Sequence, residues 1–420
     1  MSKPGQETLS LWGGSILMGA KGQRMTFGGR NKIGSKEPVW VMGILWLFLS
    51  GCAPESTPVT GETVTGEEKP VDWNTAIPEQ LILSGQQAGD PWALAHLHLA
   101  LPEEPSLESQ RQELFRLLTD SNAEIPVHGH DGHRGEQHPH LLLRTAILLA
   151  GETIPDPLLT RVRSDLSKTS FPVRWQEVND LAWLVESAAR ASLLGESSAS
   201  GTTLAHLYEK MIIDLEAADR TIGTVLNQAP DSGVRRPDGL AGPEESGCWA
   251  YTCSGAHMLG ALVECDLAGL LSSAQKKRLA QLLKRYRQRT DWEIAYRKSE
   301  LNRAIQNGVS PRRAVREYGL AVTKLLGHAL EISARASLMT PTDDGREFSV
   351  TFGRWSVELM MQVDDLFSQR ADVSTVEVYQ PLELLTADVL TPQSPVWERA
   401  FGDLCHLFRG LRLLKNPQRF

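Results

Sequence analysis

Histidines gather in one short stretch, residues 128–140, which holds five of the chain's eleven histidines. Imidazoles on a Gly-rich loop are able to bind Zn²⁺, Ni²⁺ or Cu²⁺. The candidate ligands are His128, His130, His133 and His138. No pair has the i, i+4 spacing of a helical zinc motif. We therefore favour a solvated loop that enters a helix at His138-Pro139, with a divalent transition metal as the alternative cofactor.

A second polar stretch, residues 238–257, is a long Gly-rich loop that leads into a helix of small residues. Tyr251 and His257 from this stretch, together with Asn179, form the candidate catalytic set. A Tyr or His base beside a neutralising Asn is able to move a proton in a pocket. A single histidine near the start of a packed helix is more often a structural residue. We therefore expect a structural role for His257, with catalysis as the alternative.

The elements that must position these residues are helices. From residue 80 onward, apolar residues recur at intervals of three and four, which is typical of helices with one buried face. Four helix starts are marked by a capping residue followed by Pro. These starts are Asp90-Pro91, Asp156-Pro157, Ser310-Pro311 and Ser394-Pro395. The expected helices cover residues 91–101, 107–118, 139–150, 157–166, 176–194, 203–226, 255–271, 274–305, 311–338, 348–369, 381–390 and 395–414.

The predicted fold class is therefore all-α. No alternating run is long enough for a central sheet, and residues 373–379 are expected to form one short strand at most. About twelve helices in successive hairpins predict an α/α toroid or a helical-hairpin array. The charged segment 274–303 is expected to be a solvent-facing outer helix, because its polar residues leave only a narrow apolar face.

The N-terminal region has the pattern of a secretory signal. Basic residues Arg30, Lys32 and Lys36 precede an apolar run, residues 39–49, that is shorter than the roughly 20 residues of a membrane-spanning helix. The following Leu-Ser-Gly-Cys sequence resembles the lipobox of bacterial lipoproteins. That resemblance implies that Cys52 is lipidated and becomes the first residue of the mature chain.

This pattern predicts three segments. Residues 1–51 are the lipoprotein signal peptide, whose start is Met1 or Met25. Residues 52–75 are the lipidated cysteine and a disordered tether, because they are rich in Pro, Thr, Gly and Glu and have almost nothing to bury. Residues 76–420 form a single α-helical domain. Ala53 after the cysteine implies, from the lipoprotein pattern, a place at the outer membrane, on either its periplasmic or its surface face.

Four further cysteines follow Cys52, in a compartment that permits disulfides. Cys248 and Cys253 are separated by four residues and are the candidates for a local disulfide. That bridge would leave Cys265 to pair with Cys405 or to stay free. A zinc site at Cys248 and Cys253 is less favoured, because no second cysteine pair lies nearby in the sequence.

Charge excludes one class of partner. The chain has a net charge of −8, and its first 51 residues contain six Lys or Arg against two Asp or Glu. The mature segment is therefore still more acidic, which argues against a nucleic-acid partner. The expected partners are the membrane, through the lipid anchor, and a protein, glycan or lipid ligand.

Short motifs between residues 127 and 336 resemble uncharacterised bacterial proteins related to the terpenoid-cyclase and prenyltransferase α/α toroid. They are residues 135–139 with the apolar helix that follows, Asn179-Asp-Leu-Ala-Trp183 and Cys253-Ser-Gly-Ala-His257. The resemblance implies inner helices around a central cavity and brings no activity. The chain lacks the Asp-x-Asp-Asp and Gln-x-x-x-Gly-x-Trp motifs of triterpene cyclases, so a cyclase is disfavoured.

Three functions follow from these observations. The first is a lipid-anchored envelope protein that binds a ligand, or has a structural role, through a helical cavity. The second is a polysaccharide-active lyase or glycosidase built on an α/α toroid. The third is a metal-binding lipoprotein. Because aromatic residues are only 6% of the chain and glycan clefts are usually lined with them, we prefer the first function.

Overall fold

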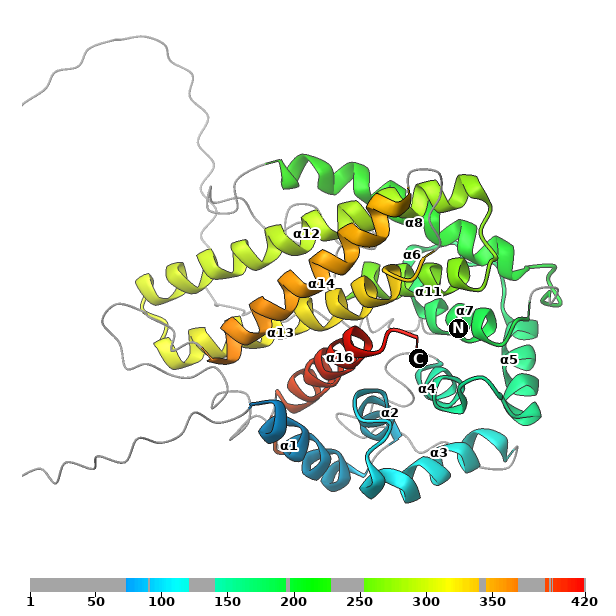
Figure 1. The fold of residues 1–420 in the computed structure, drawn as a ribbon, viewed down its shortest axis with the longest axis horizontal. Coiled ribbons are helices and arrows are strands. Elements are labelled where there is room, and N and C mark those ends of the chain that lie inside the picture. Colours follow the sequence, from blue (N-terminus) through cyan, green and yellow to red (C-terminus); the bar gives the residue numbers. More distant parts are fainter. Residues whose placement is uncertain are drawn as a thin grey trace, which may run out of the picture. The chain divides into compact units, whose positions relative to one another are not determined.

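The computed structural model describes residues 73–89, 91–120, 140–193, 197–227, 253–339, 345–368, 390–392, 394 and 396–418. These residues are α-helical, which confirms the predicted fold class (Figure 1). Outside the helices, the described residues contain one isolated β-bridge, between Ser197 and Thr203. Among the described helices, none is both long enough and apolar enough to cross a membrane. The predicted signal peptide, Cys52 and the strand at 373–379 lie outside the described residues.

The N-terminal half of the domain is built mostly from short helices. Its described helices are α1 (Trp73–Ala88), α2 (Pro91–Ala100), the 3₁₀ helix η1 (Pro105–Leu107), α3 (Glu108–Thr119), α4 (Leu141–Ala150), α5 (Asp156–Lys168), α6 (Trp175–Asp180), α7 (Ala182–Arg190) and α8 (Leu204–Leu226). Five of them, α2, α3, α4, α5 and α8, match predicted helices to within about two residues at each end, as expected for helix boundaries. Gly151 ends α4 with a φ of 65°, a left-handed conformation that glycine adopts without strain.

The described helices of the C-terminal half are α11 (Ser254–Leu267), α12 (Ser273–Gln306), α13 (Pro311–Ala336), α14 (Gly345–Ser368) and α16 (Trp397–Lys415). Three of these, α12, α13 and α14, are the longest of the described helices. A capping box starts α12. The Ser272 hydroxyl accepts from the backbone N–H of Gln275, and the side-chain oxygen of Gln275 accepts from the backbone N–H of Ser272. The predicted Ser310-Pro311 start of α13 is confirmed, with Pro311 as the first helical residue.

Two expectations about the helices were wrong. Helix α1 begins at Trp73, inside the segment predicted as tether, and it buries Trp73, Ile77 and Leu81 on one face. The helix predicted at 176–194 is two helices, α6 and α7, separated by Leu181. The interruption is one residue long. The helical hydrogen-bond pattern continues across it, since Leu181 donates to the Glu177 carbonyl and accepts from the backbone N–H of Val185. The helix predicted at 381–390 lies almost wholly outside the described residues.

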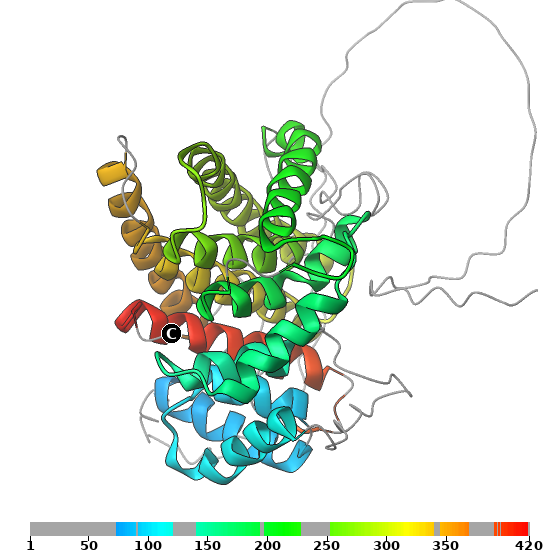
Figure 2. The ribbon, with the colours of Figure 1, turned by 90° about the vertical axis from the view of Figure 1, so that its right-hand side faces the viewer.

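Six helices pack against one another in chain order. Helix α2 contacts α4, α4 contacts α7, α7 contacts α11, α11 contacts α13, and α13 contacts α16. Helix α16 in turn contacts α2, which closes the order. Figures 1 and 2 both show α16, in red, between the yellow α13 and the blue α2. The remaining helices pack against members of this set; α12, for example, contacts α11 and α13. The charged face of α12 pairs with α8, where Arg278 lies 2.7 Å from Glu216 and Arg285 lies 2.8 Å from Asp219.

The contact between α13 and α16 is unusually close, because two glycines face the opposite helix. A Cβ atom added at Gly327 would lie 2.7 Å from the Leu407 amide nitrogen, and one at Gly410 would lie 3.0 Å from the Gly327 carbonyl oxygen. Only residues without a side chain permit this approach of two backbones. It brings the residues next to these glycines, His328 on α13 and Arg409 on α16, into the same space.

Candidate functional site

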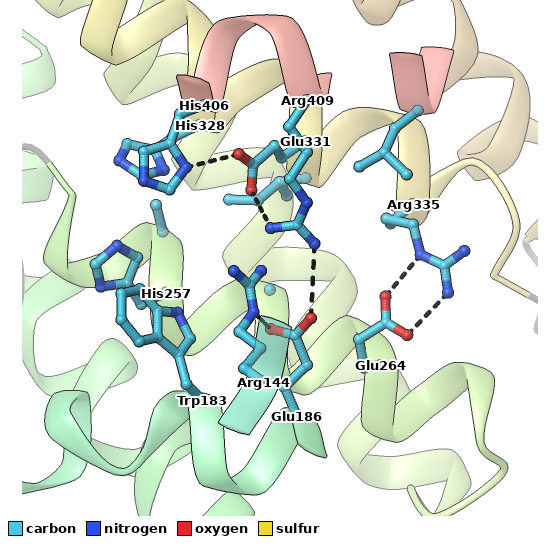
Figure 3. Close-up of a pocket in the computed structure, with 14 residues that line it drawn as sticks. Arg144, Trp183, Glu186, His257, Glu264, His328, Glu331, Arg335, His406 and Arg409 are labelled. Atoms are coloured by element: carbon cyan, nitrogen blue, oxygen red, sulfur yellow. Dashed lines mark hydrogen bonds and ion pairs between the residues drawn. The ribbon is translucent and has the colours of Figure 1, made fainter. Parts of the chain in front are cut away.

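A small cavity lies where α4, α7, α11, α13 and α16 meet (Figure 3). It has about 30 Å³ of room for the centres of water-sized groups, and one water needs roughly 10–15 Å³ on this measure. The cavity is therefore the size of two or three waters. It is lined by Arg144, Trp183, Glu186, Ala256, His257, Gly260, Glu264, His328, Glu331, Ile332, Arg335, His406, Arg409 and Leu413.

One side of the cavity is a cluster of three buried histidines, one from each of α11, α13 and α16. The His328 ring centroid lies 5.3 Å from that of His257 and 4.2 Å from that of His406. Cys253, at the start of α11, has its sulfur within 4.8 Å of a ring nitrogen of His257 and of His328. Cys253 and His257 are four residues apart, so the first turn of α11 places both on one face.

The His406 ring is oriented by a carboxylate. Its Nδ1 lies 2.7 Å from Glu331 Oε1, and the second oxygen of Glu331 accepts from Arg409 Nη1 at 3.0 Å. Because an ionised carboxylate can only accept, this contact is a hydrogen bond donated by His406 Nδ1. A histidine held in this way has the tautomer and the orientation of a metal ligand.

Cys253 is next to a half-buried cation, Lys324. Cys253 raises the pKa of Lys324, and Asp403, whose carboxylate lies 4.0 Å from the ammonium group, raises it further. Burial raises the pKa of Asp403 to about 6, against the opposing effects of Lys324 and Arg399.

The other side of the cavity is a network of buried ion pairs. Arg144 Nε lies 2.6 Å from Glu186 Oε2, and Arg409 reaches the other Glu186 oxygen at 3.7 Å. Arg335 binds Glu264 through two nitrogens at 2.6 and 2.8 Å. Arg190 joins the two parts, at 3.0 Å from Glu264 and 3.9 Å from Glu186. The guanidinium of Arg144 also lies 5.4 Å from the ring centroid of Trp183.

These contacts keep the network charged. Burial alone would raise the pKa of Glu186, but Arg144, Arg409 and Arg190 outweigh it and hold that pKa below its ordinary value. Burial, together with Arg144, lowers the pKa of Arg409 to about 10. Arg409 therefore remains cationic at neutral pH. A charged network of this kind is favourable only when each member keeps its partners.

The structure places the predicted catalytic residues apart where it describes them. His257 lines the cavity, in contact with Trp183 at 4.8 Å between ring centroids. Asn179 lies on α6 and is not among the lining residues. Tyr251 lies outside the described residues, as do His128, His130, His133 and His138. His140, the last histidine of that loop, is at the start of α4, with Nδ1 3.4 Å from Asp165.

The predicted bridge between Cys248 and Cys253 is corrected by the structure. In the described part of the chain, Cys253, Cys265 and Cys405 are free thiols, and Cys248 lies outside it. Cys253 is instead turned toward Lys324 and the histidines. Cys265 and Cys405 are buried in the apolar core, where burial raises the pKa of both thiols. The alternative in which they stay unpaired is therefore the one observed.

Most residues of the site were not predicted from the sequence, namely Arg144, Glu186, Glu264, His328, Glu331, Arg335, His406 and Arg409. A signal for them exists. Each is a polar residue on the otherwise apolar face of a helix, and all but Arg144 lie at a spacing of three, four or seven from another polar residue or ring that lines the cavity, as His328 does from Glu331. Arg144 is the single charged residue of α4. Polar groups on a face that must be buried require a buried partner.

Comparison with protein-family models, with curated proteins and with solved structures gave no match to this chain. Function is therefore inferred from the residues of the cavity.

Proposed function

We propose that this chain is a metal-binding protein that holds one divalent transition-metal ion, with Zn²⁺ the best fit, in the cluster of Cys253, His257, His328 and His406. The observation that carries the proposal is the convergence of these ligand types from three helices. Cys253, His257 and His328 have ligand atoms that all lie within 4.8 Å of one another, as do His328, His406 and Glu331.

The ligand chemistry favours zinc. One thiolate and three imidazoles form a donor set that Zn²⁺ binds tetrahedrally, with bonds of about 2.3 Å to sulfur and 2.0–2.1 Å to nitrogen. Such bonds separate neighbouring ligand atoms by roughly 3.3–3.6 Å. Cys253, His257 and His328 lie within 4.8 Å of one another, and His406 joins them through His328, so the four side chains would move closer together on binding the ion. Glu331 is better placed as the orienting partner of His406, since both of its oxygens already accept hydrogen bonds.

The location proposed for this metal site is the cell envelope. The sequence around Cys52 supports a lipid anchor at the outer membrane, so the chain would be a metal-binding lipoprotein. The sequence favoured an envelope protein that binds a ligand in a helical cavity, and the present proposal names a metal ion as that ligand. The small size of the described cavity favours an ion over a sugar ring, which supports a metal-binding role more than a polysaccharide-active one.

The proposal also includes the α/α toroid. What supports it is the closed order of helix contacts, in which α2, α4, α7, α11, α13 and α16 succeed one another and α16 returns to α2. In such a toroid these six helices form the inner wall. Each of the last five contributes at least one residue to the lining of the cavity, which would place the metal site at the centre of the fold.

The test is metal stoichiometry and affinity, measured on the full chain purified without a histidine tag. We expect wild type to bind one equivalent of Zn²⁺ in competition with a chromogenic chelator. His328→Gln is expected to weaken binding at least ten-fold, in the range found when a ligand or its orienting partner is lost. His206→Gln is the matched control, because His206 is an exposed histidine on α8.

The histidine-rich loop provides the opposing hypothesis. A variant in which His128, His130, His133 and His138 are all changed to Gln should keep the tight equivalent. If this loop variant lost the zinc while His328→Gln retained it, the metal site would belong to the loop and the proposal for the buried cluster would be wrong.

A further inference from the structure

The cavity has a second chemical feature beside the histidines, which is a guanidinium nitrogen without a partner. Arg144 is 5% exposed, and its Nη1 is a buried atom that makes no hydrogen bond. Its Nε is already bound to Glu186. Figure 3 shows the Arg144 guanidinium pointing from α4 toward Glu331 and Arg409, across the cavity that all three line.

A buried donor in this position is unfavourable unless something accepts its hydrogen bond. Leaving a charged donor unsatisfied costs more than leaving a neutral one, because the cation has lost its water. The carboxylates nearby do not fill the role: Glu186 is engaged by Arg144 Nε and Arg409, and Glu331 by His406 and Arg409. Glu264 is held by Arg335 and Arg190.

The charges of the network lead to the same conclusion. Four arginines, Arg144, Arg190, Arg335 and Arg409, face three glutamates, Glu186, Glu264 and Glu331. The network therefore has one positive charge more than it has negative charges. An excess buried cation is stabilised by an anion, and guanidinium groups bind planar oxyanions with well-directed hydrogen bonds.

We infer that the cavity binds a small monovalent oxyanion of the formate, nitrate or bicarbonate type, with Arg144 Nη1 as its principal donor and Arg409 as the second cation. The size of the cavity, about 30 Å³, admits a group of this kind and excludes a larger carboxylic acid. The anion site stands on the two arginines, which are not among the proposed metal ligands. It is therefore independent of the metal site, although both share the cavity.

The experiment is calorimetric titration of the full chain with sodium formate, after exhaustive treatment with a chelator. Ionic strength is held constant with gluconate, an anion too large for the cavity. We expect saturable binding with one site per chain, and binding at least ten-fold weaker in Arg144→Lys, which keeps the charge and loses the planar fork. His206→Gln, at an exposed histidine on α8, should bind formate as wild type does, whatever the outcome of the zinc measurement.

Arg289→Lys is the matched control. Arg289 is also a buried arginine bound to a glutamate, Glu293, but it lies outside the cavity. Arg409→Lys provides a second route if circular dichroism shows that the Arg144 variant is unfolded. Absence of saturable formate binding in metal-free wild type would overturn the inference. So would binding that appears only after zinc is added, or equal binding by wild type and a folded Arg144→Lys protein.

Discussion

The close approach of α13 and α16 predicts that a single methyl group will disrupt the site. In Gly327→Ala the new Cβ would lie 2.7 Å from the Leu407 amide nitrogen and 3.0 Å from the His406 carbonyl carbon. Both atoms belong to a helix backbone, so no side chain can rotate to relieve the contact. The two helices must separate until an ordinary contact of 3.4–4 Å is restored.

The magnitude follows from two opposing effects. Alanine is a better helix former than glycine by about 0.5–1 kcal/mol. Overpacking a well-packed interface costs about 1–3 kcal/mol and shifts the backbone. Because the contact is with backbone, we expect the second effect to win and the free energy of unfolding to fall by roughly 1–2 kcal/mol. The displacement also moves His328 away from His406, whose ring centroids are now 4.2 Å apart.

The assay is urea denaturation followed by circular dichroism, together with zinc affinity for the same protein. Gly353→Ala on α14 is the matched control, because a Cβ there would meet nothing within 4 Å. We expect this control to be as stable as wild type or more stable, with unchanged zinc affinity. If Gly327→Ala were as stable as Gly353→Ala and bound zinc normally, the reasoning about the helix contact would be refuted.

Three further predictions concern buried charges. Burial raises the pKa of Asp403 to about 6, so the folded state holds a proton that the unfolded chain releases from about pH 4 upward. The free energy of unfolding of wild type should therefore fall by roughly 3 kcal/mol between pH 4 and 6, relative to that of Asp403→Asn. Equal pH profiles of the two proteins in urea titrations would contradict this. Burial, with Arg111, lowers the pKa of His98 to about 4, so on acidification the unfolded chain binds the proton before the folded state does. Between pH 6.5 and 4 the free energy of unfolding of wild type should therefore fall by about 3 kcal/mol relative to that of His98→Leu. A difference that grew toward alkaline pH instead would show that His98 is charged in the fold. Glu186→Gln leaves buried arginines without their counter-charge and should cost about 3–5 kcal/mol. Glu113→Gln, at an exposed pair with Arg116, should cost far less, because water screens that pair; similar losses would mean that the network is not desolvated.

Much of the helical architecture is predictable from the sequence, because burial of one helix face requires apolar residues at intervals of three and four. The start of α13 at Pro311 is specified locally by Ser310-Pro311, and the end of α4 by Gly151. Helix α1 was missed because it contains Pro78 in its interior and follows a Pro- and Thr-rich segment. Its stability comes from burying Trp73 and Ile77 against other helices, which local propensity does not reveal.

The site was harder to predict, because its members are distant in the chain. His257 was identified as a candidate, but the spacing of residues 238–257 gave no indication that His328 and His406 meet it. Those contacts depend on the packing of α13 against α16, which Gly327 and Gly410 permit. The histidine-rich loop drew attention by composition alone, whereas the buried histidines are isolated in the sequence and gathered by the fold.

The most direct test of the proposed metal site is X-ray absorption spectroscopy at the zinc edge, on the full chain loaded with one equivalent of Zn²⁺. The proposed ligands predict four-coordinate zinc with one sulfur at about 2.3 Å and three nitrogens at about 2.0–2.1 Å. Cys253→Ser should remove the sulfur contribution. A shell of oxygen and nitrogen without sulfur in wild type, or a sulfur signal that persists in Cys253→Ser, would contradict the assignment.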